Sequence, residues 1–242
     1  MTKPYYEDEC VTLYHGDCRE VTDWLTADVL VTDPPYGQDY RSNFAGAASK
    51  LARSIANDAD TSVRDSMLAL WGDKPRIVFE GRDVPPIAPR VARLIWHKPG
   101  AGMGDLSVPW QPDYEFISVN GTGFTGHRGS SVLTNPLRVF RGVQLHPHTK
   151  PDGLMESLIA KTPPGVIADP FAGSGSTLVA ARNLGRKVIG VELEEKYCEL
   201  IVSRLSQQAF DFTALEPSSP ELRSSGWPQH DTEDGLFKEW AP

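Results

Sequence analysis

Short runs of apolar, largely β-branched residues alternate with stretches of helical character along most of the chain. Most of the runs are followed by a turn signal such as Gly, Pro, Asn or Asp. They predict six strands, at residues 29–31, 76–79, 94–96, 114–119, 166–168 and 187–191. The stretches between them predict four helices, at residues 62–71, 154–162, 176–184 and 194–208. Because strands that are apolar throughout are buried on both faces, the alternation predicts an α/β fold with a doubly wound, mostly parallel sheet.

The 242 residues are enough for one large domain with a proper core. We expect this domain to span residues 1–208. Residues 120–145 and 37–60 look irregular, and long loops at strand ends are where such sheets bind substrates. From about residue 209 the chain is rich in Pro, Ser, Asp and Glu, which predicts an extended acidic tail over residues 209–242.

Several classes of protein are excluded by composition. No apolar run approaches the roughly 20 residues that cross a bilayer, and the N-terminus lacks the order of a signal peptide, so we expect a cytoplasmic protein without a membrane partner. Cys10, Cys18 and Cys198 form no paired pattern, and we interpret them as small buried hydrophobes. His127 has no second ligand at a useful spacing, so we expect no metal site.

Charge is distributed unevenly along the chain. The net charge is −8, yet residues 74–150 carry 10 basic and 5 acidic side chains. Residues 206–242 carry 2 basic and 7 acidic side chains. A basic middle segment between acidic ends is typical of a protein that grips phosphate on one face.

A glycine-rich stretch, IADPFAGSGST at residues 167–177, lies between a predicted strand and a predicted helix. Glycines at such a turn let the backbone come close to a nucleotide-like ligand. The next predicted strand ends at Glu192, whose carboxylate can accept bonds from both hydroxyls of a ribose. The stretch lacks the GxGxxG pattern and the lysine of a phosphate loop, so a dinucleotide or a triphosphate is disfavoured.

A second motif, Asp33-Pro34-Pro35-Tyr36, follows an apolar strand. The two prolines fix the backbone and remove two amide donors. Asp33 and the Pro34 carbonyl can each accept an N–H bond from an amino group on a planar base, while the ring of Tyr36, expected to be exposed, stacks on it. Holding both protons frees the nitrogen lone pair for in-line attack on a methyl group, which is catalysis by positioning and electrostatics.

The two motifs together resemble those of S-adenosylmethionine-dependent DNA amino-methyltransferases, and their order, catalytic motif first, is similar to the permuted β class. Further similar elements lie at residues 15–18 (HGDC), 96–99 (WHKP), 113–116 (DYEF) and 146–151 (HPHTKP). The resemblance covers most of residues 10–205. It implies a class I, Rossmann-like methyltransferase fold with circularly permuted motif order, and S-adenosylmethionine as cofactor.

The resemblance also implies the roles of individual residues. The catalytic set is Asp33, Pro34, Pro35 and Tyr36. The cofactor set comprises Asp17 at the adenine, Glu192 at the ribose, Lys150 at the methionine end, and the glycine-turn residues Asp169, Phe171, Gly173, Ser174, Gly175 and Thr177. In the HPHTKP element His148 replaces the usual Thr, so we favour Lys150 over its neighbours as the contact.

The implied activity is site-specific methylation of adenine N6 in double-stranded DNA, on a base flipped out of the duplex. The DPPY motif is commoner in adenine enzymes and SPPY in cytosine-N4 enzymes, yet the two amines react alike and cytosine N4 stays open. An RNA methyltransferase, a protein-glutamine methyltransferase and a non-catalytic DNA-binding relative also stay open as functions of this fold.

The segment that reads the target is expected at residues 120–145, which is short for base-specific recognition. Its candidates for DNA contact are His127, Arg128, Arg138 and Arg141, because arginine can lie bidentate on guanine or hold phosphate. The resemblance further implies a restriction-modification setting, with a homodimer and a cognate restriction enzyme as expected partners.

Overall fold

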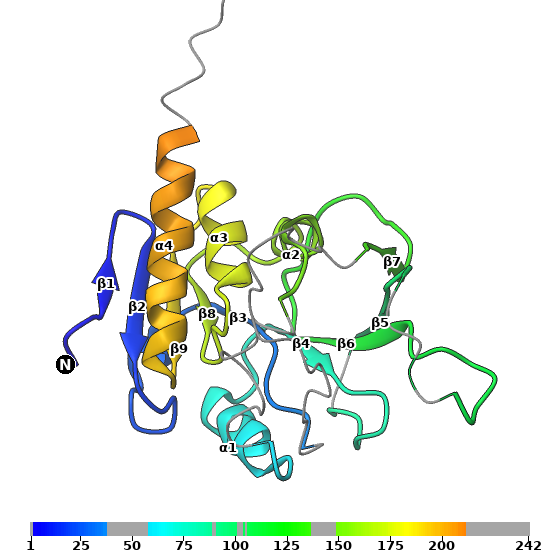
Figure 1. The fold of residues 1–242 in the computed structure, drawn as a ribbon. Coiled ribbons are helices and arrows are strands. Elements are labelled where there is room, and N and C mark those ends of the chain that lie inside the picture. The colour runs from blue at the N-terminus through cyan, green and yellow to red at the C-terminus, as the bar shows by residue number, and fades with distance from the viewer. Residues whose placement is uncertain are drawn as a thin grey trace, which may run out of the picture.

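The computed structural model describes residues 2–37, 58–88, 91–100, 104, 106–136 and 149–211, and within them nine strands form one sheet (Figure 1). The strands are β1 (Tyr6–Glu7), β2 (Val11–His15), β3 (Val29–Thr32), β4 (Arg76–Glu80), β5 (Ala92–His97), β6 (Tyr114–Asn120), β7 (Val132–Thr134), β8 (Ile167–Asp169) and β9 (Val188–Glu192). The helices are α1 (Ser62–Trp71), α2 (Asp152–Ile159), α3 (Ser176–Asn183) and α4 (Glu195–Asp211), and a 3-10 turn, η1, spans Asp23–Thr26.

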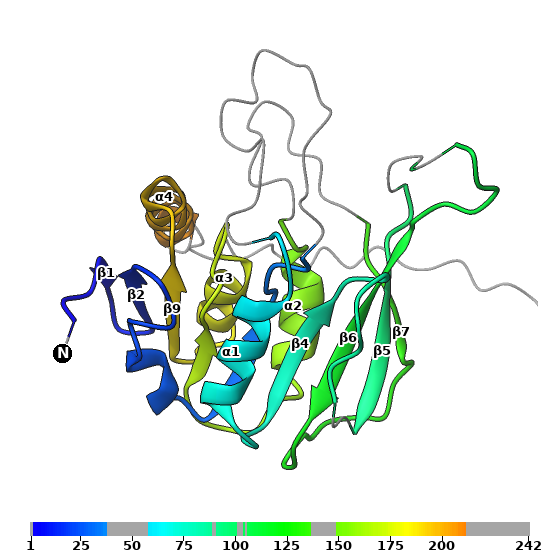
Figure 2. The same cartoon turned by 90° about the horizontal axis from the view of Figure 1, so that it is seen from below.

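The sheet has the order β1-β2-β9-β8-β3-β4-β6-β5-β7, and Figure 2 shows it from one edge to the other. The five neighbouring strands β2, β9, β8, β3 and β4 are parallel to one another. Strand β6 is antiparallel to both β4 and β5, and β1 is antiparallel to β2. The prediction of a doubly wound, mostly parallel sheet is therefore confirmed.

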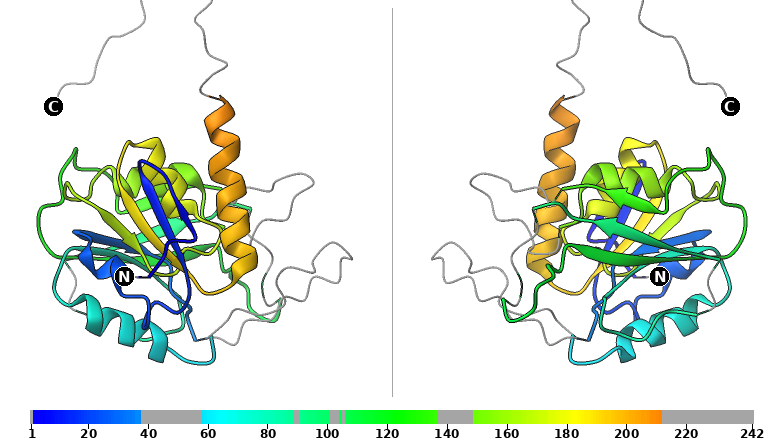
Figure 3. Two further views of the ribbon diagram at one scale, coloured as in Figure 1. Left: turned by 90° about the vertical axis from the view of Figure 1, so that its left-hand side faces the viewer. Right: turned by 90° about the vertical axis from the view of Figure 1, so that its right-hand side faces the viewer.

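Helices cover both faces of the sheet: α2, α3 and α4 lie on one face and α1 on the other (Figure 3). The apolar strands supply both cores, since alternate residues of a strand point to opposite faces. In β3, Val29 and Val31 pack in the core beneath α2, α3 and α4, whereas Leu30 packs in the core beneath α1. The second core is centred on the stacked rings of Trp24 and Trp71.

Some elements differ from the sequence-based prediction. Strands β1 and β2 were missed, because β1 is too short and β2 mixes polar with apolar residues. Strand β7 lies inside residues 120–145, which we expected to be irregular, and it pairs with β5. Helix α2 ends at Ile159 rather than at residue 162, since Lys161 and Thr162 make tighter turn bonds, and α4 runs to Asp211 rather than to residue 208.

Two predictions about composition can be compared with the described residues. Cys18 and Cys198 are fully buried in the two cores, as expected, and Cys10 is partly buried. No described helix has the length and apolar character needed to span a membrane.

The parallel strands bring the two sequence motifs to one edge of the sheet. Strand β3 pairs with β8, so residues 33–36 and the glycine turn begin side by side. Strand β2 pairs with β9, with His15 opposite Glu192. Because the carboxyl ends of parallel strands meet at one edge, this is where such a sheet binds ligands.

Candidate active site

The corner Asp33-Pro34-Pro35-Tyr36 directly follows β3, whose four residues are buried. The Tyr36 hydroxyl donates to Asp33 Oδ1 at 2.6 Å, so the corner closes on itself. The Tyr36 ring also packs on Gly81, where a Cβ atom would lie 3.1 Å from Tyr36 Cγ. The prediction that the Tyr36 ring is exposed is therefore wrong for the free protein. The ring is half-buried, because Gly81 has no side chain and leaves room for it.

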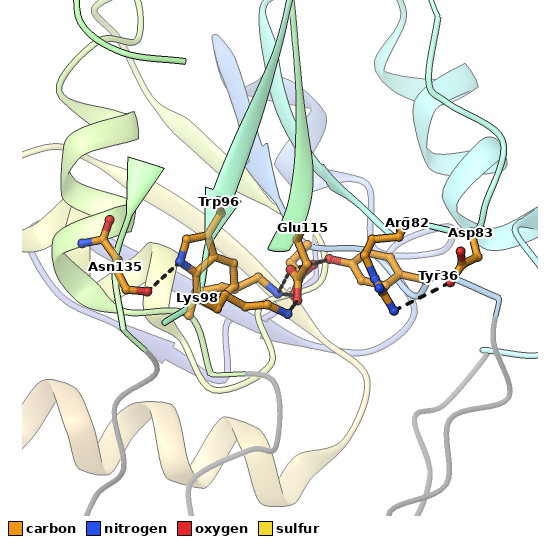
Figure 4. Close-up of polar contacts among 9 residues, drawn as sticks. Tyr36, Arg82, Asp83, Trp96, Lys98, Glu115 and Asn135 are labelled. Atoms are coloured by element: carbon orange, nitrogen blue, oxygen red, sulfur yellow. Dashed lines mark hydrogen bonds and ion pairs between the residues drawn. The ribbon is translucent and has the colours of Figure 1, made fainter. Parts of the chain in front are cut away.

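Lys150 is buried against this corner, although it lies far from it in the sequence. Its ammonium pairs with Asp33 Oδ2 and lies 3.3 Å from Glu115 Oε2. Glu115, on β6, is also 3.2 Å from the Tyr36 hydroxyl and 2.9 Å from Lys98 Nζ. Figure 4 shows Glu115 between Tyr36 and Lys98. We predicted Lys150 as a cofactor contact, and the structure shows its side chain paired with Asp33, the candidate catalytic carboxylate.

The protonation states of Lys150 and Tyr36 follow from this cluster. Burial lowers the pKa of Lys150, but the charges of Asp33 and Glu115 raise it more, and the net shift is upward. Burial and the same two carboxylates hold the pKa of Tyr36 well above its ordinary value. At neutral pH, Lys150 is therefore a cation and Tyr36 a neutral hydrogen-bond donor.

In the glycine turn after β8, Gly173 has open space beside its Cα atom, whereas Gly175 is packed against a side chain. Gly173 and Gly175 have φ values of +52° and +81°. A Cβ at Gly175 would lie 2.8 Å from Ile201 Cγ1, whereas at Gly173 the nearest atom is 3.9 Å away. Arg204 fixes the turn by donating to the Ser174 carbonyl and to Asp152. The open side at Gly173 fits a ligand that approaches the backbone closely.

This difference between the two glycines gives a paired prediction. Alanine at residue 175 should destabilise the fold by about 1–2 kcal/mol for the left-handed backbone alone, and by more for the contact with Ile201. Gly173→Ala carries the backbone cost without the clash, and it fills the space where the cofactor is expected. Thermal unfolding and cofactor titration should therefore rank the variants in opposite orders, and equal loss of both quantities would contradict the assignment.

Glu192 ends β9 beside the glycine turn. Its Oε2 accepts the Gly173 N–H at 2.7 Å and its Oε1 accepts the Glu194 N–H at 2.8 Å. The side chain is almost buried, and this burial raises its pKa to about 7 despite those two bonds. Each carboxylate oxygen keeps a further lone pair, so Glu192 can still accept ribose hydroxyls.

Asp169 couples the two motifs. Its Oδ1 accepts the Thr32 hydroxyl at 2.6 Å and the Phe171 N–H at 3.2 Å, and its carboxylate also accepts a bond from Thr177. Burial raises the pKa of Asp169 to about 6. Since Thr32 directly precedes Asp33, one hydrogen bond joins the Asp33–Tyr36 corner to the glycine turn.

Asp17 lies at the same edge, two residues after β2 and near Glu192, whose carbonyl accepts the Gly16 N–H at 2.9 Å. Arg19 binds the Asp17 carboxylate through Nε at 2.9 Å and Nη2 at 2.5 Å. These hydrogen bonds lower the pKa of Asp17. The expected adenine contact is thus a carboxylate that already pairs with a neighbouring guanidinium.

The expected DNA contacts are described in part. His127 and Arg128 are exposed on the loop between β6 and β7, away from the motifs in the sequence. Lys161 donates to the His127 carbonyl at 2.5 Å, within this loop. Just after β7, the Asn135 carbonyl accepts the Trp96 indole N–H at 2.9 Å (Figure 4). Arg138, Arg141 and His148 lie outside the described residues, so their roles stay predictions.

Sequence reasoning missed two members of the site. Glu115 and Lys98 were assigned to motifs but to no role. Glu115 lies on β6 and Lys98 directly follows β5, its antiparallel partner, in which Trp96 is the register partner of Glu115. A carboxylate on β6 and a lysine directly after the neighbouring strand β5 were the signal that could have identified them.

The fold and the joined motifs define a DNA amino-methyltransferase, and comparison with known proteins supports that class. The DNA methylase family model matches residues 93–203. The type II methyltransferase M2.LlaDCHI of Lactococcus lactis subsp. cremoris is 44% identical, and the match covers 86% of this chain and 94% of that protein. The chain therefore belongs to the DNA methylase family, the S-adenosylmethionine-dependent enzymes that act on adenine N6 or cytosine N4.

Two solved structures share the fold. The PvuII DNA methyltransferase (cytosine-N4-specific) has a TM-score of 0.61 at 17% identity, covering 90% of this chain and 91% of that one. The M1.HpyAVI–SAM complex has a TM-score of 0.54 at 22% identity, covering 80% of this chain and 99% of that one. The Rossmann-like methyltransferase fold is thereby confirmed.

Proposed function

We propose that this protein methylates adenine N6 in double-stranded DNA, and that it belongs to the permuted β class. The observation that carries the proposal is the Asp33–Tyr36 corner, joined through Thr32 and Asp169 to the glycine turn. Asp33 favours adenine over cytosine, because the motif of cytosine-N4 enzymes usually begins with Ser. The position of β3 before β8 in the chain supports the permuted class.

The residues of the glycine turn fit the cofactor. Glu192 would bind the ribose, Asp17 the adenine, and the open side of Gly173 would face the rest of the molecule. When bound, S-adenosylmethionine supplies an electrophilic methyl group. Lys150 is kept as a contact of the methionine end. The further candidates in the turn are Asp169, Phe171, Ser174, Gly175 and Thr177, and those with buried side chains would act by shaping the turn.

The corner would orient the target amine. Asp33 and the Pro34 carbonyl each accept one N–H bond, which leaves the nitrogen lone pair free. Pro35 keeps the corner rigid, and the Tyr36 ring supplies a stacking face once the base has left the duplex. One N–H proton is released on methylation, and the Asp33 carboxylate is the acceptor nearest to it.

One assay tests substrate, cofactor and target atom together. Purified protein is incubated with unmethylated duplex DNA and labelled S-adenosylmethionine, and the DNA is digested to nucleosides for mass spectrometry. N6-methyladenine is the expected product. N4-methylcytosine would overturn the choice of base and keep the corner chemistry, and label found only on RNA or protein substrates would overturn DNA as the substrate.

The same proposal extends to partners and setting. We propose a cytoplasmic, homodimeric modification enzyme that acts beside a cognate restriction enzyme. Only the modification role finds support in the name of the relative, a type II methyltransferase. We also keep His127, Arg128, Arg138 and Arg141 as DNA contacts, because they lie in the basic middle segment.

DNA affinity should then depend steeply on salt, because each phosphate contact releases counterions. Replacing Arg128 by alanine should lower affinity for all sequences and reduce the slope of log K against log salt by about one, if Arg128 binds phosphate. Fluorescence anisotropy with labelled duplexes at several salt concentrations measures this. Lys187→Ala, a basic residue outside the middle segment, is the control, and an unchanged slope in Arg128→Ala would remove that residue from the interface.

A further inference from the structure

Two carboxylates in the site share the same two hydrogen-bond donors. The Tyr36 hydroxyl is 2.6 Å from Asp33 Oδ1 and 3.2 Å from Glu115 Oε2. The Lys150 ammonium pairs with Asp33 Oδ2 and lies 3.3 Å from the same Glu115 Oε2. Glu115 therefore offers a second acceptor to the Tyr36 hydroxyl and to the Lys150 ammonium, both of which bind Asp33 in the free protein.

This sharing matters because Asp33 must also accept the target amine. Both of its oxygens already accept bonds, one from a tyrosine and one from a cation. Lys150 is only 4% exposed, so its charge cannot turn to water when the bond to Asp33 weakens. An unpaired buried ammonium is costly, and a second carboxylate within reach removes that cost.

We propose that Glu115 is a positioning residue that takes over the Lys150 ammonium and the Tyr36 hydroxyl when the target amine binds Asp33. This inference rests on the proposed function. The exchange needs no change in net charge, since each donor already lies between the two carboxylates. It leaves Asp33 with acceptor capacity for the amine and its proton.

Lys98 has a complementary role in this arrangement. It binds Glu115 Oε1 at 2.9 Å, on the oxygen that faces away from Tyr36 and Lys150, and so leaves Oε2 for the exchange. The positive charges of Lys98 and Lys150 then balance the negative charges of Asp33 and Glu115. The rings of Phe79 and Trp96 lie 4.9 and 5.6 Å from Lys150 Nζ and form apolar walls around it. Such walls strengthen each ion pair, because they keep the local dielectric low.

Glu115→Gln is the first test, since it keeps the shape of the side chain and removes its charge. We expect kcat for DNA methylation to fall by about 30-fold, whereas cofactor Kd and the unfolding temperature of the free protein change little, because Lys150 still pairs with Asp33. Glu115→Asp should recover part of kcat. Asp113→Asn is the matched control, because it removes a nearby carboxylate that pairs with His97 instead, and it should keep the wild-type rate.

A double variant separates exchange from simple support of the fold. In a Lys150→Met background there is no ammonium to transfer, so Glu115→Gln should cost less than about threefold in single-turnover rate. Equal losses in the two backgrounds would assign Glu115 a merely structural role and overturn the proposal, as would a wild-type kcat in Glu115→Gln. Wild-type protein runs in parallel: absence of DNA methylation there would refute the proposed function itself, a result distinct from failure of the Glu115 variants alone.

Discussion

Replacing Asp33 by alanine is expected to lower kcat for DNA methylation by about 10³-fold or more, while cofactor affinity stays within about threefold of the wild type. The loss follows from the two tasks proposed for this carboxylate, which are to orient the amine and to accept its proton. Apart from Lys150, the candidate cofactor residues lie after β2, on β8 and β9 and in the glycine turn, and the hydroxyl of Thr32, the residue before Asp33, bonds to one of them, Asp169. Single-turnover methylation and calorimetric titration with cofactor measure the two quantities.

The fold should tolerate this substitution. Lys150 keeps Glu115 as a partner when Asp33 is removed, so the buried ammonium stays paired. Asp33→Asn is the matched variant, because it retains one acceptor oxygen and loses the charge, and we expect a rate between those of alanine and aspartate. An alanine variant that methylates DNA at the wild-type rate would refute the assigned mechanism, whereas parallel loss of cofactor binding would refute the division of roles.

Local sequence was enough to predict the parts of the site that each strand carries by itself. The strand endings at Asp33, Asp169 and Glu192 were predictable, because apolar parallel strands are easily recognised and their carboxyl ends share one edge. The glycine turn was predictable for the same reason, since a strand, glycines and a helix follow one another directly. The resemblance then supplied the chemical role of each motif.

Contacts between distant segments could not be predicted in this way. The pairing of Lys150 with Asp33 spans 117 positions and joins the segment before α2 to the end of β3. Glu115 reaches the corner because β6 turns antiparallel beside β4, with Phe116 as the register partner of Glu80. No local pattern fixes such a register, so the pairing of Lys150 with Asp33 was not predicted, and its role as a cofactor contact stays a prediction.

The second large effect is expected from substitution of Glu192, and it concerns cofactor affinity. Alanine at this position is expected to weaken cofactor binding by about 100-fold, because hydrogen bonds to a charged acceptor contribute about 1.5–3 kcal/mol each. At saturating cofactor, kcat should change only a few-fold, since Glu192 does not contact the catalytic corner. The effect is the reverse of that in Asp33→Ala, and titration of both variants under one set of conditions compares them directly.

The pH dependence of the wild type gives this prediction a second readout. Burial raises the pKa of Glu192 from 4.5 to about 7, so the free folded protein favours the protonated carboxyl. Its contribution to the stability of the free protein is full below about pH 4.5 and is lost as pH rises through about 7. In the proposed role of Glu192, cofactor binding needs the ionised form, because that form accepts the ribose hydroxyls. Cofactor affinity should therefore fall by up to about tenfold per pH unit below pH 7, and the cofactor-induced rise in unfolding temperature should grow with pH.

Glu192→Gln separates this titration from that of Asp169, whose pKa is raised in the same direction, to about 6. The glutamine variant cannot ionise, so its cofactor affinity should be weak throughout and should lose the step near pH 7, while any step near pH 6 persists. Isothermal titration from pH 5.5 to 8.5 in buffers of one ionic strength measures both. If the wild type and Glu192→Gln have parallel pH profiles, the titrating group is not Glu192, and the ribose would have to be bound by another side chain at this edge of the sheet.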